Sequence, residues 1–164
     1  MKPVTFMVEP WSQVWRELQP LWDAHWQEVA LHRDEIKLAI DFDAYAQQEA
    51  MGCLQVMVAR CEGFVVGYHL SFIHPHLHYR NSLSAYSDVY FIDPNYRKGA
   101  TGINLFKEVE KAWVARGVQR AFTGTKLSLD MGRIFEHLGW SESERTYCKL
   151  LKGGNGGVPS SSQP

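Results

Sequence analysis

Apolar residues recur at helical spacing through most of the first thirty residues, after a short strand-like opening at Val4–Val8. This spacing indicates helices with one buried face. Pro20 falls within the series, and because proline lacks the backbone N–H that a helix interior needs, we expect two consecutive helices. Good helix formers at residues 44–51 lie between Asp43, a suitable N-cap, and Gly52, so a third, short helix is expected there. The apolar series consists of Trp11, Val14, Trp15, Leu18, Leu21, Trp22, His25, Trp26 and Val29.

In the middle of the chain the pattern changes to the alternation of apolar and polar residues that strands show. Residues 54–60 and 64–73 are predicted to pair as a hairpin around the turn Glu62-Gly63. Residues 83–92 alternate as a third strand, and the turn-forming sequence Asp93-Pro94-Asn95 ends it.

The helical period then returns in residues 103–113, with charged residues on the opposite face, and Gly117 ends this helix. A strand is expected at residues 119–125, a short helix at about 130–138, and a last strand at 144–151. The apolar face of the longer helix consists of Ile103, Phe106, Val109 and Trp113.

These elements describe a single domain at residues 1–152. The order of helices, three strands, helix, strand, helix and strand predicts an α/β (α+β) fold, with one mixed sheet and helices on both of its faces. Residues 153–164 are rich in Gly, Ser and Pro and contain no run that could form a core. We expect them to be a flexible tail.

Composition narrows the classes of function. The 164 residues include 17 basic and 18 acidic ones, for a net charge of −1, so no overall positive field favours nucleic acid or anionic lipid as a partner. The opening sequence lacks the apolar core of a signal peptide, and no later stretch is long enough to span a bilayer. Cys53, Cys61 and Cys148 form an odd set without metal-ligand spacing, which favours a reducing compartment. We therefore expect a cytoplasmic protein.

The most informative segment is Arg97-Lys98-Gly99-Ala100-Thr101-Gly102, which joins the third strand to the longer helix. The first N–H groups of a helix lack partners within it and the helix dipole is positive there, so a phosphate binds readily. Arg97 and Lys98 add charge, and Gly99 and Gly102 allow the backbone to approach an anion closely. A ligand that carries a pyrophosphate is implied.

This segment resembles the signature of the GNAT superfamily of N-acetyltransferases: Arg or Gln, two residues, Gly, one residue, and Gly or Ala at the start of a long helix. Ala100 stands where the signature usually has Gly. Residues 134–140, Ile-Phe-Glu-His-Leu-Gly-Trp, look like the second landmark of the family, a short helix that runs into Leu-Gly-aromatic. The resemblance covers residues 88–140 by motif and residues 54–151 by the order of strands.

The resemblance implies an enzyme that transfers the acetyl group of acetyl-CoA to an amine, on a small molecule or on a protein lysine or N-terminus. It also implies a mostly antiparallel sheet in which the strand before the phosphate turn splays from the next one to admit pantetheine. The backbone of Tyr90, Phe91 and Ile92 would then contact the thioester and the pantetheine amides. The pyrophosphate would lie on the backbone of residues 97–102, from Arg97 through Lys98, Gly99, Ala100 and Thr101 to Gly102.

Acid–base chemistry has fewer candidates. Amine attack needs the neutral amine, and Asp88 is the acidic residue of the third strand, where it shares a face with Tyr86 and Tyr90. We predict Asp88 as the base, with a solvated or salt-bridged strand residue as the alternative.

The usual acid of the family is a tyrosine at the position of Phe135, and phenylalanine cannot donate a proton. We predict Tyr147 of the last strand as the donor. His137 and a thiolate that leaves unaided remain the alternatives.

Two residue clusters permit other interpretations. His69, His74, His76 and His78 lie on or near one hairpin, but no acidic or cysteine ligand is close in sequence, so we expect no metal. The GNAT resemblance places the tip of this hairpin near the substrate side, which implies a role beside the acceptor. The tryptophans of the first helices are expected in the core, with an acceptor wall or a homodimer surface as alternatives. The rival to an active enzyme is a catalytically weak or silent acyl-CoA-binding interaction protein of the same fold, which the missing tyrosine at Phe135 keeps open.

Overall fold

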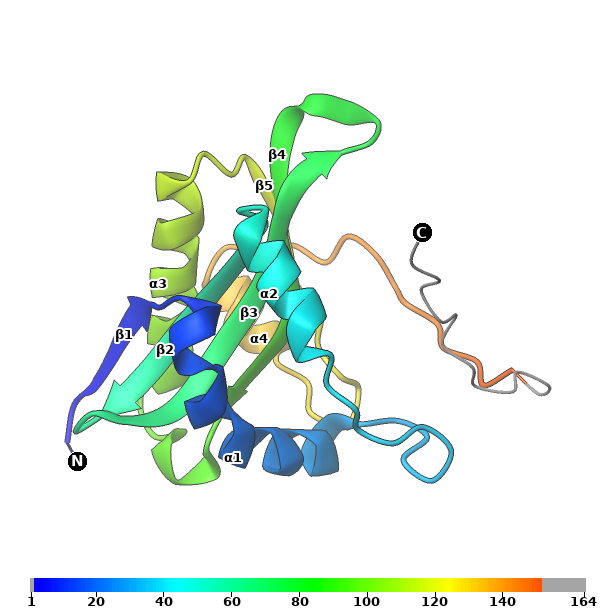
Figure 1. Ribbon diagram of the computed structural model, residues 1–164. Coiled ribbons are helices and arrows are strands. Elements are labelled where there is room, and N and C mark those ends of the chain that lie inside the picture. The colour runs from blue at the N-terminus through cyan, green and yellow to red at the C-terminus, as the bar shows by residue number, and fades with distance from the viewer. Residues whose placement is uncertain (1, 152–164) are drawn as a thin grey trace, which may run out of the picture.

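Five strands form one central sheet in the order β1-β2-β3-β4-β5 (Figure 1). The strands are β1 (Val4–Val8), β2 (Leu54–Cys61), β3 (Phe64–His76), β4 (Tyr79–Ile92) and β5 (Arg120–Phe122). Neighbouring strands are antiparallel, except that β4 and β5 run parallel. This computed structural model describes residues 2–151, and the tail predicted for residues 153–164 lies outside them. The predicted mixed, mostly antiparallel sheet is confirmed.

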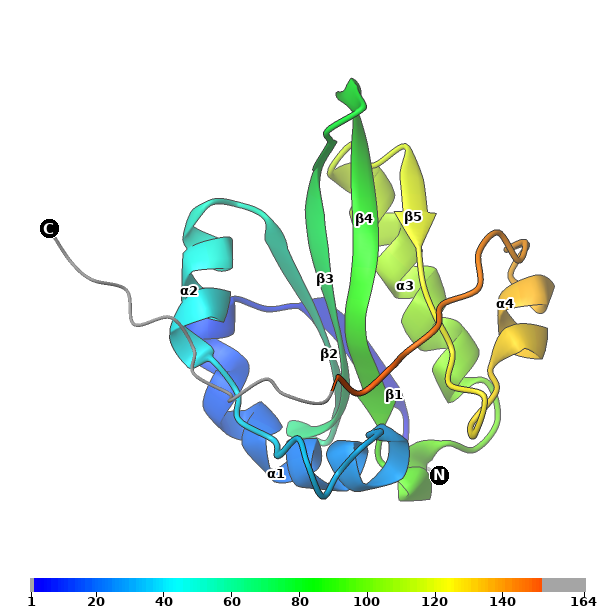
Figure 2. The same cartoon turned by 90° about the vertical axis from the view of Figure 1, so that its right-hand side faces the viewer.

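Helices cover both faces of the sheet (Figure 2). The helices are α1 (Trp11–Val29), α2 (Phe42–Ala50), α3 (Thr101–Ala115) and α4 (Gly132–His137), with a 3-10 turn, η1 (Pro94–Tyr96), before α3. On one face α1 and α2 pack through the tryptophans Trp11 and Trp22, and on the other α3 packs through Leu105, Val109 and Trp113. Within residues 2–151 no helix combines the length and the apolar character needed to cross a bilayer.

The N-terminal helices differ from their prediction in two details. Pro20 does not divide them: α1 is one helix that contains Pro20 and bends near its middle (Figure 1). Proline removes one internal hydrogen bond, which kinks a helix without ending it when the flanking turns are packed. The N-cap of α2 is Asp41, whose side chain accepts from the backbone N–H of Ala44, and Asp43 lies in the first turn.

The predicted last strand is wrong. Residues 144–151 form no strand, and the chain extends away from the sheet there (Figure 1). The strand β5 has only three residues, Arg120–Phe122, instead of the expected seven positions at 119–125. Its outer edge is therefore too short to hold a further strand of eight residues, because each pair of backbone hydrogen bonds needs a partner on both strands.

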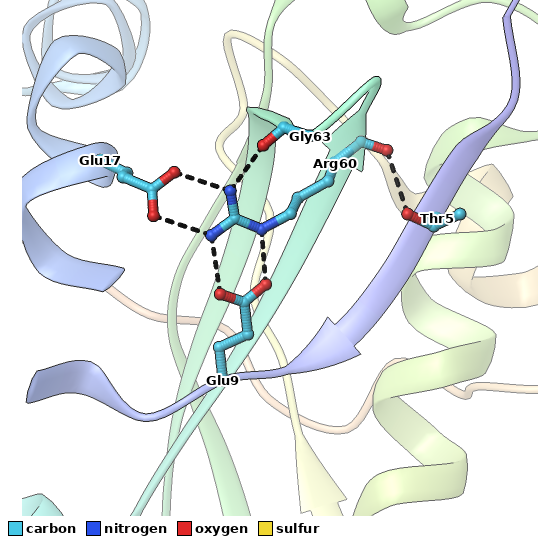
Figure 3. A network of polar contacts seen from close by, with 5 residues as sticks. All are labelled: Thr5, Glu9, Glu17, Arg60 and Gly63. Atoms are coloured by element: carbon cyan, nitrogen blue, oxygen red, sulfur yellow. Dashed lines mark hydrogen bonds and ion pairs between the residues drawn. The ribbon is translucent and has the colours of Figure 1, made fainter. Parts of the chain in front are cut away.

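Arg60 of β2 ties three segments together at one end of the sheet (Figure 3). Its Nε and Nη2 donate to the two carboxylate oxygens of Glu9 at 2.7 Å, and its Nη1 and Nη2 donate to Glu17 of α1 at 2.7 and 2.9 Å. Nη1 also donates to the carbonyl of Gly63 at 2.8 Å. The side chains of Arg60 and Glu9 are only 20% and 17% exposed. All the donors of a guanidinium are thus used to fix the start of α1 against β2.

We expect Arg60→Lys to lower the free energy of unfolding by about 1–3 kcal/mol, because an ammonium cannot serve two carboxylates and a carbonyl in one plane. Urea unfolding measures this loss. Arg33→Lys is the matched control, since the Arg33 side chain donates only to Gln27 at the surface. Equal urea midpoints of unfolding for the wild type and Arg60→Lys would show that the hydrogen bonds of the Arg60 guanidinium add no stability.

Candidate functional site

The two edges of strand β4 differ in how far they are paired with a neighbouring strand. β3 pairs with β4 from Tyr79 to Ile92, whereas β5 pairs only with Ser84–Tyr86 of β4. Beyond these three positions the chain after β5 turns away from β4 (Figure 2). The backbone groups of residues 87–92 on this edge therefore have no strand partner within residues 2–151. The Ile92 carbonyl accepts from Arg97 instead, and the groups of residues 87–91 can be used by a ligand. The splayed strand pair predicted from the sequence is present.

A cavity of about 650 Å³ occupies this wedge. It runs from the end of α1 past the open edge of β4 to the start of α3 and the loop after β5. A volume of this size is typical of small-molecule sites. The predicted cofactor residues that line it are Tyr90, Phe91, Ile92, Arg97, Gly99 and Gly102, whereas Lys98, Ala100 and Thr101 do not.

The phosphate turn is shaped for an anion. Gly99 has φ +64°, a left-handed conformation that glycine adopts without strain. Ala100 is the N-cap of α3 and has no side-chain oxygen, so the first N–H groups of α3 are not capped by it. A Cβ built on Gly102 would meet no described atom within 4 Å, so this side of the helix start faces open space. Thr101 Oγ1 donates to the Lys98 carbonyl and stabilises the turn from within.

Arg97 has a different role from the one the motif implies. Its guanidinium forms a two-pronged ion pair with Glu28 of α1, at 2.7 and 2.6 Å, and its Nε donates to the Ile92 carbonyl at 2.7 Å. The side chain therefore fastens the end of α1 to the phosphate turn. Among the cavity-lining residues the other positive side chain is Lys126, from the loop after β5, which sequence analysis did not identify.

Asp88 occupies a β-bulge. Val89 pairs with Leu70 and Ser87 pairs with Ser71, so Asp88 is an extra residue on β4. A bulge interrupts the alternation of side chains. Asp88 accordingly points to the face of α2, where its carboxylate accepts a hydrogen bond from Tyr45 Oη at 2.5 Å. The prediction that Asp88 shares a face with Tyr90 is wrong, although it does line the cavity as expected.

Tyr90 lies on the opposite face and spans the wedge. Its hydroxyl donates to the Gly124 carbonyl at 2.7 Å, and its ring meets Phe106 and Phe135 edge-to-face at 5.1 and 6.2 Å. Burial raises the pKa of Tyr90, so its phenol stays protonated at neutral pH. Phe135 is 7% exposed and completes this aromatic cluster as a packing residue.

His25 is a cavity residue that the sequence motifs did not reveal. Its Nδ1 lies 2.8 Å from Tyr68 Oη, and its ring stacks on Phe91 at 5.0 Å. Burial lowers the pKa of His25 to about 4, and Arg97 and Lys126 act in the same direction against the Glu28 carboxylate. The sequence did contain one indication of this role. His25 is a polar residue in an otherwise apolar helical series, and a polar side chain on a buried face needs a hydrogen-bond partner.

Neither Tyr147 nor His137, the two predicted proton donors, lines the cavity. The Tyr147 side chain is 89% exposed in the segment that forms no strand, although its neighbour Thr146 lines the cavity. His137 is an exposed residue at the end of α4. Because the predicted position of Tyr147 depended on a last strand, the structural basis for that assignment is absent.

No protein-family model and no curated protein sequence matches the chain. Solved structures do resemble it. An aminoglycoside acetyltransferase, meta-AAC0020 from an uncultured soil metagenomic sample, superposes with a TM-score of 0.69 over 91% of this chain and 97% of that one, at 16% identity. A ribosomal-protein-alanine N-acetyltransferase from Brucella melitensis biovar Abortus 2308 superposes with a TM-score of 0.67, also at 16% identity. The superposition covers 91% of this chain and 99% of that one. The chain has the GNAT acetyltransferase fold.

A third structure of the GNAT fold, a predicted acetyltransferase with acetyl-CoA from Clostridium acetobutylicum, superposes with a TM-score of 0.66. It covers 91% of this chain and 96% of its own length at 9% identity. Identities this low establish the common architecture, and the chemistry of the site has to be argued from its own residues.

The other two residue clusters do not line the cavity. His69 is fully buried and bonds Ser87 through Nε2, and burial lowers its pKa to about 3. His76 lies against His78 at the hairpin tip. Within residues 2–151 no group of three or more His, Cys, Asp or Glu side chains is placed to hold a metal. Trp11 and Trp22 pack in the core, as expected.

We expect His25 to make stability depend on pH. Its folded pKa lies below the ordinary value of 6.5, so the stability it contributes is present above pH 6.5 and lost as pH falls toward 4. His25→Gln removes this titration but keeps a polar partner for Tyr68. Between pH 7 and 5 the wild type should lose about 1–2 kcal/mol more unfolding free energy than the variant. Urea unfolding at both pH values measures it, with the exposed His137→Gln as control; identical losses in wild type and His25→Gln would contradict the assignment.

Proposed function

We propose that this protein is an N-acetyltransferase that moves the acetyl group of acetyl-CoA to an amine. The acceptor is a small molecule or a protein lysine or N-terminus. The observation that carries the proposal is the cavity, which joins an uncapped helix start to an open strand edge and to a carboxylate beyond it. These are the parts that anion binding, thioester positioning and amine deprotonation require.

The cofactor half of the cavity suits acetyl-CoA. The pyrophosphate would lie on the backbone of residues 97–102 at the start of α3. Lys126 of the cavity lining would supply positive charge, and Lys98, which lies outside the lining, would add charge from the turn. The pantetheine arm would follow residues 90–92 of β4, which have no strand partner on the side of β5. A backbone N–H at that edge would stabilise the oxyanion as the amine attacks, an effect commonly worth about 3 kcal/mol.

The reaction proceeds by direct transfer. Asp88 accepts a proton from the ammonium, directly or through water, and the neutral amine attacks the acetyl carbonyl carbon. A C–N bond forms and the C–S bond breaks, the nitrogen gives up its second proton to water, and the products are an acetamide and the CoA thiolate. A thiolate is a good leaving group, so water can supply its proton, and the reaction requires no acid at Phe135 or Tyr147.

A catalytically silent acyl-CoA-binding protein is the second candidate. It is favoured by Phe135, which packs against Phe106 at 5.0 Å where the family usually has an acid. Release of free CoA in the presence of a panel of amines separates the two functions, because a silent protein binds acetyl-CoA without turnover.

We expect Gly102→Glu to reduce acetyl-CoA affinity by about 100-fold or more, because it places a negative charge at the positive end of α3. Folding should survive, since a Cβ at this position has room. Calorimetry measures the affinity, and Gly102→Ala, which adds bulk without charge, is the matched control. Wild-type affinity in a folded Gly102→Glu protein would place the cofactor elsewhere.

We expect Asp88→Asn to lower turnover by about 100-fold and to remove the acidic limb of the rate-versus-pH profile, because the amide cannot accept the proton. Tyr45→Phe removes the hydrogen bond to the carboxylate but keeps the carboxylate itself, so its profile should retain that limb. Turnover of amine acceptors over the pH range measures both variants. An Asp88→Asn enzyme with the wild-type profile would reduce Asp88 to a structural residue.

A further inference from the structure

A buried histidine holds a serine that lines the cavity. His69 of β3 is fully buried, and its Nε2 lies 2.9 Å from the Oγ of Ser87 on β4. Ser87 is among the residues that line the cavity, whereas His69 lies behind it. The imidazole is surrounded by the rings of Tyr90, Phe106 and Trp113, whose centres lie 6.1, 5.5 and 5.4 Å away. Burial of a polar side chain among aromatic rings costs free energy, and the bond to Ser87 offsets part of that cost.

The ring nitrogens of His69 decide what the Ser87 hydroxyl can do. Burial lowers the pKa of His69 to about 3, so the imidazole is neutral at neutral pH and carries one hydrogen. Its Nδ1 is buried and has no hydrogen-bond partner within residues 2–151. A buried N–H without an acceptor is rarer in proteins than a buried acceptor without a donor, so the hydrogen is on Nε2. His69 therefore donates to Ser87 Oγ.

This direction of the hydrogen bond leaves the hydroxyl hydrogen of Ser87 free to donate. The bond from His69 is the one hydrogen bond that the Ser87 side chain makes within residues 2–151. A serine hydroxyl that accepts a hydrogen bond can still donate one, and accepting strengthens it as a donor. Because Ser87 lines the cavity, a ligand in the cavity can receive this bond.

Ser87 is also next to the proposed base. It precedes Asp88 at the β-bulge, and the two side chains point to opposite faces of the sheet, toward His69 and Tyr45 respectively. The helix α3 covers the face of Ser87 and α2 covers the face of Asp88 (Figure 2). Both residues line the cavity. An amine that Asp88 deprotonates would attack a carbonyl beside Asp88, and that carbonyl would lie within reach of the neighbouring Ser87 hydroxyl.

We propose that Ser87 is a catalytic residue that donates a hydrogen bond to the thioester carbonyl oxygen of acetyl-CoA, and that His69 is its positioning residue. This inference deepens the proposed function and rests on it. As the amine nitrogen bonds to the carbonyl carbon, an electron pair of the C=O bond moves onto oxygen, and the hydrogen bond from Ser87 strengthens. The pair returns as the C–S bond breaks, and Ser87 keeps its proton throughout. A donor placed in advance stabilises charge that develops in the transition state.

Kinetics of Ser87→Ala test the catalytic role. We expect kcat to fall about 100-fold while the KM for acetyl-CoA stays within about twofold, because the lost bond is strongest in the transition state. Ser84→Ala is the matched control and should keep the wild-type kcat. Ser84 is a buried serine of the same strand whose Oγ has no partner within residues 2–151, and it does not line the cavity. A wild-type kcat in folded Ser87→Ala overturns the proposal.

Two spectroscopic measurements need no turnover. Infrared spectra of bound acetyl-CoA with an isotope label at the carbonyl report the thioester C=O stretch, which a hydrogen bond moves to lower frequency. We expect a lower frequency in the wild type than in Ser87→Ala, and equal frequencies overturn the contact. Nitrogen NMR of histidine-labelled protein shows which ring nitrogen of His69 carries the hydrogen. A hydrogen on Nδ1 overturns the proposal, because Ser87 would then donate to His69 and not to the ligand.

The outcomes separate this inference from the proposed function. Equal turnover of amines by the wild type and Ser87→Ala overturns the role of Ser87 while the proposed function stands. Binding of acetyl-CoA without release of CoA to any amine overturns the proposed enzyme, and the infrared comparison then decides whether Ser87 contacts the thioester. Failure of the protein to bind acetyl-CoA overturns both.

Discussion

The unequal pairing of β4 is the constraint on which the site depends. β3 holds β4 along its whole length, so the strand is rigid, whereas β5 releases it after three residues. A cavity opens between them without any loss of support for β4. Rigid support beside an open edge allows a backbone to position a ligand precisely enough for catalysis.

Contacts from α1 close the cavity on one side. Phe91 of β4 receives the ring of His25 at 5.0 Å and the guanidinium of Arg97 at 5.1 Å, and Glu28 pairs with that guanidinium. The motif assigns Arg97 to phosphate binding, but its side chain donates its hydrogen bonds to Glu28 and to the Ile92 carbonyl. The positive charge offered to an anion then comes from the helix start and from lysines, which act as mobile point charges.

The bulge at Asp88 places the side chains of Asp88 and Tyr90 on opposite faces of β4. Tyr90 turns toward α3 and bridges to Gly124 within the wedge, while Asp88 turns toward Tyr45. One extra residue therefore separates the proposed cofactor side from the proposed acceptor side. Regular alternation would have placed both side chains on one face, with no carboxylate on the other.

The sequence by itself determined most of the fold, because hydrophobic periodicity and turn-forming residues act over a few positions. They predict the hairpin, the third strand, the turn with Gly99 and the helix after it. The same information located the cavity-lining residues Gly99 and Gly102, because a glycine turn before a helix is a local feature. Only the tertiary structure decided the partner of Arg97, the facing of Asp88 and the place of His25 and Lys126 in the cavity. It also decided that residues 144–151 form no strand, since pairing needs an edge that β5 is too short to provide. These outcomes depend on segments far apart in the chain, and no spacing within one segment encodes them.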